Sequence, residues 1–196
     1  MDQTMHIITE EIQHDGKDSF DFHRYEPTPY PVLDTIFSAF PPKPDDILVD
    51  YGCGLGRLNF YAAYRFHVAS VGIEMSDEYY HRALANKKSF VGQKDCISFL
   101  HCRAEEYTVS KNDTIFYFFN PFSLTIFRPV IRNILLSYEE APRTITLLLY
   151  YPEDELIFYM ERHTCFQLID EIAASDAIIR DRRERFLVYQ LSTGPR

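Results

Sequence analysis

Two acidic residues and three glycines lie in the first half of the chain at a spacing that could bind a small nucleotide-like ligand. Asp50 ends an apolar run, and Gly52, Gly54 and Gly56 follow it at alternate positions. Glu74 ends the next apolar run. Glycine lets the backbone adopt positive φ and lets a ligand approach the main chain closely. A carboxylate at the end of a second strand can accept hydrogen bonds from the hydroxyl groups of a ribose, so the pattern predicts a ribose-containing ligand.

The residues around these five predict the elements that would position them. Residues 47–49 and 68–73 are typical of buried strands, and residues 58–66 between them have apolar side chains at helical spacing. Strand, helix and strand form a parallel crossover, which brings both strand ends to one edge of a sheet. Dinucleotide enzymes have Gly-x-Gly-x-x-Gly instead, so a nicotinamide-dependent oxidoreductase is a weaker interpretation. A tight strand-to-helix turn with a solvated Glu74 is the non-functional alternative.

The stretch Asp50-Tyr51-Gly52-Cys53-Gly54-Leu55-Gly56, together with Glu74, resembles the first two motifs of class I S-adenosylmethionine-dependent methyltransferases. The resemblance extends in element order over most of residues 44–191. It implies S-adenosyl-L-methionine as cofactor and an α/β fold: a Rossmann-like, doubly wound, mostly parallel seven-stranded sheet with an antiparallel C-terminal strand pair. It divides the chain into an N-terminal arm and helix, 1–43, and a catalytic domain, 44–196. The cofactor-binding residues that it implies in this stretch are Asp50, Gly52, Cys53, Gly54, Gly56 and Glu74.

The resemblance implies three further cofactor contacts downstream. The residue after the ribose acid, here Met75, packs against the adenine in this family, and a thioether suits a flat apolar surface; ordinary core packing is the alternative. After the predicted strand 97–100 the family often places an acid and a small residue that bind the adenine edge. This chain has Arg103 where the acid commonly stands. Ala104 can still offer its backbone N–H to a ring nitrogen, and Glu105 can accept from the exocyclic amine. A capped surface turn is the alternative.

The residues Asn120-Pro121-Phe122 follow a bulky apolar run, 114–119, that is typical of a central parallel strand. In the family, the end of this strand lies beside the transferring methyl group, so the resemblance places Asn120 among the cofactor contacts too. The sequence is similar to the Asn-Pro-Pro-aromatic motif of enzymes that methylate amide or exocyclic amine nitrogens, with one proline missing. The Asn120 carbonyl can orient a nitrogen nucleophile, Pro121 can fix the loop, and Phe122 can form one wall. The alternative is a proline turn that closes a strand.

A proline-rich segment, 22–31, precedes the first predicted strand, and its alternating prolines favour an extended backbone. In many class I methyltransferases the corresponding segment closes over the methyl donor. By this resemblance Tyr25, Thr28 and Tyr30 are the expected contacts. A rigid surface connector is an equally good interpretation. The preceding residues, 1–22, are polar and uneven and are interpreted as an arm.

The remaining periodic segments complete the predicted sheet and its helices. The strands are expected at 143–151, 165–172 and 186–191, the last two as an antiparallel pair. The charged stretch 173–185 between that pair is interpreted as a mobile loop, where substrate contacts are often made. The predicted helices span 32–40, 76–91, 123–138 and 152–162.

The composition limits which binding partners and which cellular compartment are expected. The chain has a net charge of −9, which disfavours binding to a large nucleic acid. The four cysteines lack the spacing of a metal site, so no metal is predicted and the thiols are expected to be reduced. No run of about 18 apolar residues is present in the sequence, and the first thirteen residues lack a signal-peptide pattern. The expectation is a cytoplasmic protein without a membrane partner.

The sequence thus predicts an S-adenosylmethionine-dependent methyltransferase that methylates nitrogen on a protein side chain or a small molecule. Ring faces attract a sulfonium or ammonium group, so an aromatic wall is expected around the reacting atoms. No catalytic base stands out. The alternative is a non-catalytic cofactor-binding or interaction module that retains the fold. The aromatic residues that could supply the wall are Tyr25, Tyr30, Phe119, Phe122, Tyr150 and Tyr151.

Overall fold

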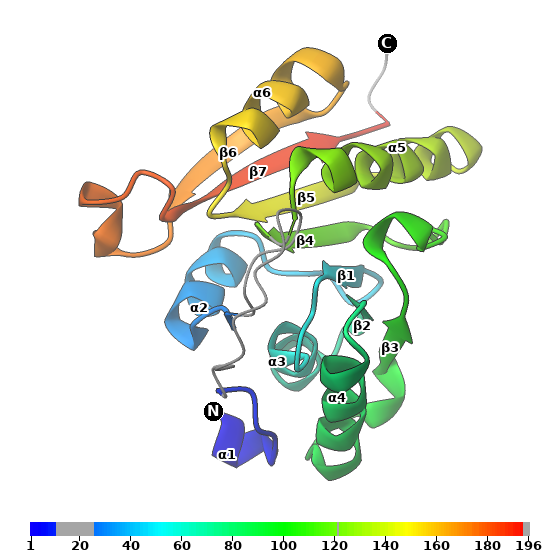
Figure 1. The fold of residues 1–196 in the computed structure, drawn as a ribbon, viewed down its shortest axis with the longest axis vertical. Helices are drawn as coiled ribbons and strands as arrows, with labels where there is room; N and C mark the ends of the chain where they lie inside the picture. Colours follow the sequence, from blue (N-terminus) through cyan, green and yellow to red (C-terminus); the bar gives the residue numbers. More distant parts are fainter. Residues whose placement is uncertain (11–25, 121, 194–196) are drawn as a thin grey trace.

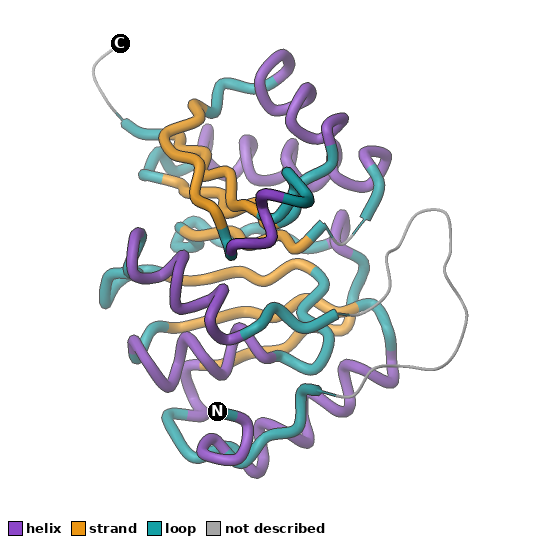
Figure 2. Tube along the Cα trace, turned by 90° about the vertical axis from the view of Figure 1, so that its left-hand side faces the viewer, coloured by secondary structure: helices purple, strands orange, loops and turns teal. Residues whose placement is uncertain are grey.

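A seven-stranded sheet forms the middle layer of the molecule, with helices on both of its faces (Figure 2). The computed structural model of the 196-residue chain describes residues 1–10, 26–120 and 122–193. The strand order is β3-β2-β1-β4-β5-β7-β6. The first five strands are parallel, while β7 runs antiparallel to both β5 and β6. The predicted α/β fold, with its antiparallel C-terminal pair, is confirmed.

The strands lie where the apolar runs of the sequence predicted them, with shifts of one to two residues at most ends. Residues of β1, β4 and β5 are buried on both faces, as expected for central parallel strands. The strand bounds are β1 Ile47–Tyr51, β2 Ala69–Glu74, β3 Ile97–His101, β4 Ile115–Phe119, β5 Ile145–Tyr150, β6 Gln167–Ala173 and β7 Arg185–Leu191.

The four predicted helices are confirmed, as is the crossover helix between β1 and β2. The Ser76 hydroxyl accepts from the Tyr79 N–H at the start of α4, as its position before two acids predicted. Pro129 lies inside α5. One short helix, α1, was not predicted. The helix bounds are α1 Asp2–Met5, α2 Tyr30–Ala39, α3 Arg57–Phe66, α4 Asp77–Ser89, α5 Leu124–Glu140 and α6 Asp154–His163, with 3-10 turns η1 Lys94–Cys96, η2 Ala104–Glu106 and η3 Asp176–Ile179.

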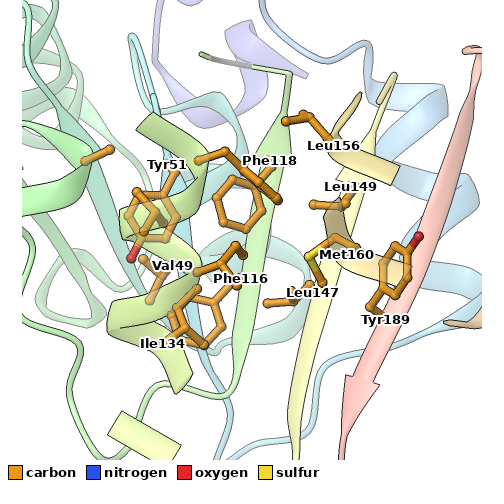
Figure 3. Close-up of a cluster of buried hydrophobic side chains, with 14 of the residues drawn as sticks. Val49, Tyr51, Phe116, Phe118, Ile134, Leu147, Leu149, Leu156, Met160 and Tyr189 are labelled. Atoms are coloured by element: carbon orange, nitrogen blue, oxygen red, sulfur yellow. The ribbon is translucent and has the colours of Figure 1, made fainter. Parts of the chain in front are cut away.

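The helices divide between the two faces of the sheet (Figure 1). Helices α5 and α6 cover one face, and α2, α3 and α4 cover the other. Under α5 and α6 the rings of Tyr51 and Phe118 are nearly parallel, with an interplanar angle of 9° and centroids 5.0 Å apart (Figure 3). Burying one large apolar side chain contributes about 1.5–3 kcal/mol, so this cluster fixes β1 against β4.

The parallel register places three strand ends level with one another. Asp50 pairs with Gly72 of β2 and with Tyr117 of β4. The carboxyl ends of β1, β2 and β4 therefore form one edge of the sheet. Asp50, Glu74 and Asn120 lie at this edge, as the sequence predicted.

The N-terminal arm docks on α4. Met5, Ile7 and Thr9 are buried at alternate positions, and Asn86 of α4 accepts from the Ile8 N–H and donates to its carbonyl. This alternation is too short to stand out from a polar sequence. Among the described residues, no helix is both long and apolar enough to cross a membrane.

Candidate active site

Backbone N–H groups of the glycine turn between β1 and α3 are hydrogen-bonded within the protein. Gly52, Gly54 and Gly56 have φ of 77°, 53° and 84°. The N–H groups of Gly52 and Cys53 donate to the carbonyl of Ile73 at the end of β2. A Cβ on Gly56 would lie 2.6 Å from the ring of Phe99, so both its φ and its packing require glycine. The turn is thus rigid before any ligand binds.

Glu74 holds this turn through backbone hydrogen bonds. One carboxylate oxygen accepts from the Gly54 N–H at 2.9 Å, and the other accepts from the Ser76 N–H at 2.7 Å. The side chain of Glu74 is largely buried. A carboxylate has about four acceptor positions, so Glu74 retains capacity for a diol.

Asp50 and Glu74 form a buried pair of acids. Burial, and then the negative charge of Glu74, raise the pKa of Asp50 to about 8. Burial also raises the pKa of Glu74, against the hydrogen bonds from Ser76 and Gly54. The amide of buried Asn59 lies 3.3 Å from Oδ2 of Asp50 and, with its nitrogen facing the carboxylate, donates to Asp50. A cationic ligand would favour the ionised form of this pair.

The three downstream residues that are predicted to contact the cofactor lie near the ends of β2 and β3. The side chain of Met75 is 43% exposed, so the core alternative for this residue is excluded. Ala104 is buried at the start of η2. Glu105 accepts a hydrogen bond from Nε of Arg103 at 2.6 Å. Arg103, which stands where the family commonly has an acid, is thus the ion-pair partner of Glu105. Their contacts with adenine remain predictions.

Asn120 directly follows β4 and has a φ of 36°. Its Nδ2 lies 3.5 Å from Oε1 of Glu153, and its buried Oδ1 has no hydrogen-bond partner among the described residues. Pro121 lies outside the described residues. Phe122 is buried in the core with its ring edge-on to Phe118, instead of standing free at the edge. A role for Phe122 as an acceptor wall is therefore not supported by the position of its side chain.

An aromatic group continues this edge beyond β4. The rings of Phe119 and Tyr150 have centroids 4.5 Å apart, and Tyr150 stacks on Phe186 at 4.8 Å. Tyr151 follows with a φ of 54°. The charged stretch 173–185 packs here, because the Tyr150 hydroxyl donates to Glu184. This contact ties the stretch to the sheet edge.

The segment before α2 is tied to the same region through Arg57. The Thr28 hydroxyl is 2.7 Å from the Tyr117 hydroxyl, beside Asp50 in the sheet, and its carbonyl accepts from Arg57. Arg57 also donates to Thr9 at 2.7 Å and lies over the ring of Tyr30.

The three residues predicted from this segment differ in burial. Thr28 is buried, whereas Tyr30 is partly buried and its hydroxyl donates to Asp2. Tyr25 lies outside the described residues. Sequence reasoning missed Arg57, although its place directly after the glycine turn was a usable signal.

A glycine turn after β1, an acid ending β2 and this strand order define the class I S-adenosylmethionine-dependent methyltransferases. A family model described as "Histone methylation protein DOT1" matches residues 7–116. The match covers more than half of the chain, and the chain therefore belongs to this family.

Two curated proteins with local similarity to this chain are methyltransferases. A protein-lysine N-methyltransferase of Saccharolobus islandicus (strain REY15A) is 43% identical over 63 residues, which cover 32% of this chain and 39% of that protein. A probable cobalt-precorrin-6B C(15)-methyltransferase (decarboxylating) of Archaeoglobus fulgidus is 40% identical over 48 residues, 24% of this chain and 29% of that protein. The chain thus matches well under half the length of either relative.

Solved structures show the same fold at low identity. An RNA methyltransferase from Salinibacter ruber in complex with S-adenosyl-L-homocysteine has a TM-score of 0.59 and 21% identity, over 87% of this chain and 97% of that chain. The glycopeptide N-methyltransferase MtfA, complexed with S-adenosylmethionine, has a TM-score of 0.63 and 12% identity, over 83% of this chain and 87% of that chain. At these identities the likeness establishes the architecture alone.

Proposed function

We propose that this chain methylates a lysine side chain of a protein, with S-adenosylmethionine as methyl donor. The observation that carries the proposal is the carbonyl oxygen of Asn120, which has no hydrogen-bond partner among the described residues and follows β4 at the same sheet edge as Asp50 and Glu74. The local similarity to a protein-lysine N-methyltransferase and the family description support lysine as the acceptor. A small-molecule amine is the nearest alternative.

The donor side of the site consists of Asp50, the glycine turn and Glu74. S-adenosylmethionine supplies an activated methyl group on a positively charged sulfur and carries a ribose diol. The buried acid pair fits a cationic ligand, because attraction to a positive charge offsets the repulsion between Asp50 and Glu74. Glu74 can accept from a diol while it keeps its bonds to Gly54 and Ser76.

The acceptor side consists of Asn120, Tyr151, Glu153 and Arg183. The Asn120 carbonyl can accept a hydrogen bond from a neutral amine and so direct the nitrogen lone pair toward the methyl group. Orientation of this kind contributes strongly to rate because the reacting atoms must be aligned. The acidic net charge favours a basic protein over RNA as substrate.

Calorimetric titration of S-adenosylmethionine and S-adenosylhomocysteine tests the donor side. We expect micromolar binding to the wild type and a loss of about 100-fold or more in Glu74→Ala, which removes a buried charged acceptor and the support of the turn. The exposed Glu139 on α5 provides the control, because Glu139→Ala removes the same charge far from the turn. Absence of binding by the wild type would contradict the proposal.

Methyl transfer from a radiolabelled donor tests the acceptor side. A lysine-rich peptide should be methylated, while the same peptide with every lysine replaced by arginine, and an RNA of equal length, should not. Asn120→Ala should lower kcat by about 100-fold and leave donor affinity unchanged. If Asn120→Ala matches the wild type, or no acceptor is methylated by a donor-binding protein, the interaction-module alternative replaces this proposal.

A further inference from the structure

Two non-glycine residues with positive φ lie side by side at the sheet edge. Phe119 of β4 pairs with Tyr150 of β5, and the next residue on each strand is the strained one. Asn120 has a φ of 36° and Tyr151 a φ of 54°. Such conformations persist where the surrounding structure holds them, and they cluster at functional sites.

The other described non-glycine residues with positive φ have a local explanation. His6 and His67 are the C-caps of α1 and α3, where a left-handed residue is common. Asn120 and Tyr151 instead directly follow strands β4 and β5. The Tyr151 N–H donates to the Arg185 carbonyl, and the side chains of both residues meet a network that includes Arg183 from the segment before β7.

Arg183 contacts Tyr151 directly and reaches Asn120 through Glu153. Its Nη1 donates to Oε1 of Glu153 at 2.7 Å, and its Nη2 donates to the Tyr151 hydroxyl at 2.9 Å. Its Nε donates to Oδ1 of Asp181 at 3.2 Å, and Asp181 also accepts from the Tyr151 hydroxyl. The guanidinium lies 4.5 Å from the centre of the Tyr151 ring. One planar group thus contacts two acids and a tyrosine at once.

Glu153 extends this network to Asn120. Glu153 is the N-cap residue of α6, and its Oε1 accepts from Arg183 while it faces Nδ2 of Asn120 at 3.5 Å. An ionised carboxylate can only accept hydrogen bonds. It therefore selects one of the two amide orientations of Asn120, the one with the NH2 group toward Glu153 and the carbonyl away from it.

We propose that Arg183 and Glu153 are positioning residues that fix the Asn120 amide with its carbonyl directed to the acceptor nitrogen. Arg183 holds Glu153 and the Tyr151 side chain, and Glu153 sets the direction of the amide. The inference rests on the proposed function, since it names what orients the acceptor group. Lysine could replace one of these contacts but lacks the planar fork that makes several.

The test compares four variants by donor affinity, turnover and the NMR signals of the Asn120 side-chain NH2. The variants are Arg183→Ala, Arg183→Lys, Glu153→Gln and the control Arg182→Ala, which removes the same charge from an exposed neighbour. Gln can donate as well as accept, so Glu153→Gln removes the orientation bias at nearly equal size. The probes are S-adenosylmethionine and the lysine-rich peptide.

We expect Arg183→Ala and Glu153→Gln to shift the Asn120 NH2 signals, and to lower kcat about tenfold while donor affinity stays within about twofold. Arg183→Lys should recover part of the turnover, and Arg182→Ala should behave as wild type. Unchanged Asn120 signals in Arg183→Ala would overturn the proposal, as would a parallel fall in donor affinity and melting temperature, which marks a general structural role. Absence of donor binding by the wild type would instead overturn the proposed function.

Discussion

At the carboxyl edge of the sheet, the proposed donor side and the proposed acceptor side are held by different kinds of bonds. On the donor side, Glu74 accepts from backbone N–H groups of Gly54 and Ser76, and the turn docks on β2 through main-chain bonds. On the acceptor side, the Tyr151 N–H donates to the Arg185 carbonyl, but the side chains of Asn120 and Tyr151 are held by other side chains, chiefly Glu153 and Arg183. The main-chain bonds of the turn persist through most substitutions other than those of Glu74 and the glycines, whereas the side-chain network around Arg183 can be lost in one substitution.

This difference implies that the donor side tolerates little change in its backbone. Gly56→Ala places a Cβ 2.6 Å from Phe99 at a φ of 84°. Strain and overpacking together should lower the free energy of unfolding by about 3 kcal/mol. Thermal unfolding should show a fall in Tm of roughly 10 °C. Ser98→Ala, exposed beside Phe99, is the control, and an unchanged Tm in Gly56→Ala would contradict the rigid turn.

The acid pair makes the donor side sensitive to pH. The pKa of Asp50 is about 8 in the folded protein, above its ordinary value of 3.8, so between these values the folded state binds more protons than the unfolded state. Stability without ligand should therefore fall as pH rises from 4 to 8, by at most about 1.4 kcal/mol per pH unit, and level off above 8.

Asp50→Asn checks this assignment, because the amide resembles the protonated acid at every pH. Denaturant unfolding at pH 6 and pH 8.5 should show a smaller difference in the variant than in the wild type. Equal differences in both proteins would mean that another group titrates.

The acceptor side should show the smallest change in stability. Asn120→Gly relieves a strained φ but adds freedom to the unfolded chain, and these effects oppose each other. The free energy of unfolding should change by less than about 0.5 kcal/mol, while turnover falls because the amide is gone. Phe119→Gly, one residue earlier, should cost far more because it removes a packed ring. A large loss of stability in Asn120→Gly would argue against strain at this position.

The same contrast explains what the sequence could predict. Asp50, the glycines and Glu74 lie within one crossover unit, so short-range patterns were enough to place them. Arg183 is separated in sequence from Glu153 by 30 residues and from Tyr151 by 32. No local sequence pattern predicts contacts at such separations. The docking of the arm was missed for a related reason: Met5 and Ile7 are buried against α3 and α4, which lie far along the chain. Phe122 was expected at the edge, yet its ring packs in the core beside Phe118.

The place of β7 between β5 and β6 has a consequence for synthesis on the ribosome. Residues 185–191 pair with both neighbours, although every other strand precedes them in the chain. Until they emerge, the outer edge of β5 remains open and β6 lacks its partner. The donor side, whose strands are complete by residue 101, can fold first, whereas the acceptor side must wait for the last strand. Interrupted synthesis would thus leave an exposed strand edge, the kind of surface that chaperones protect.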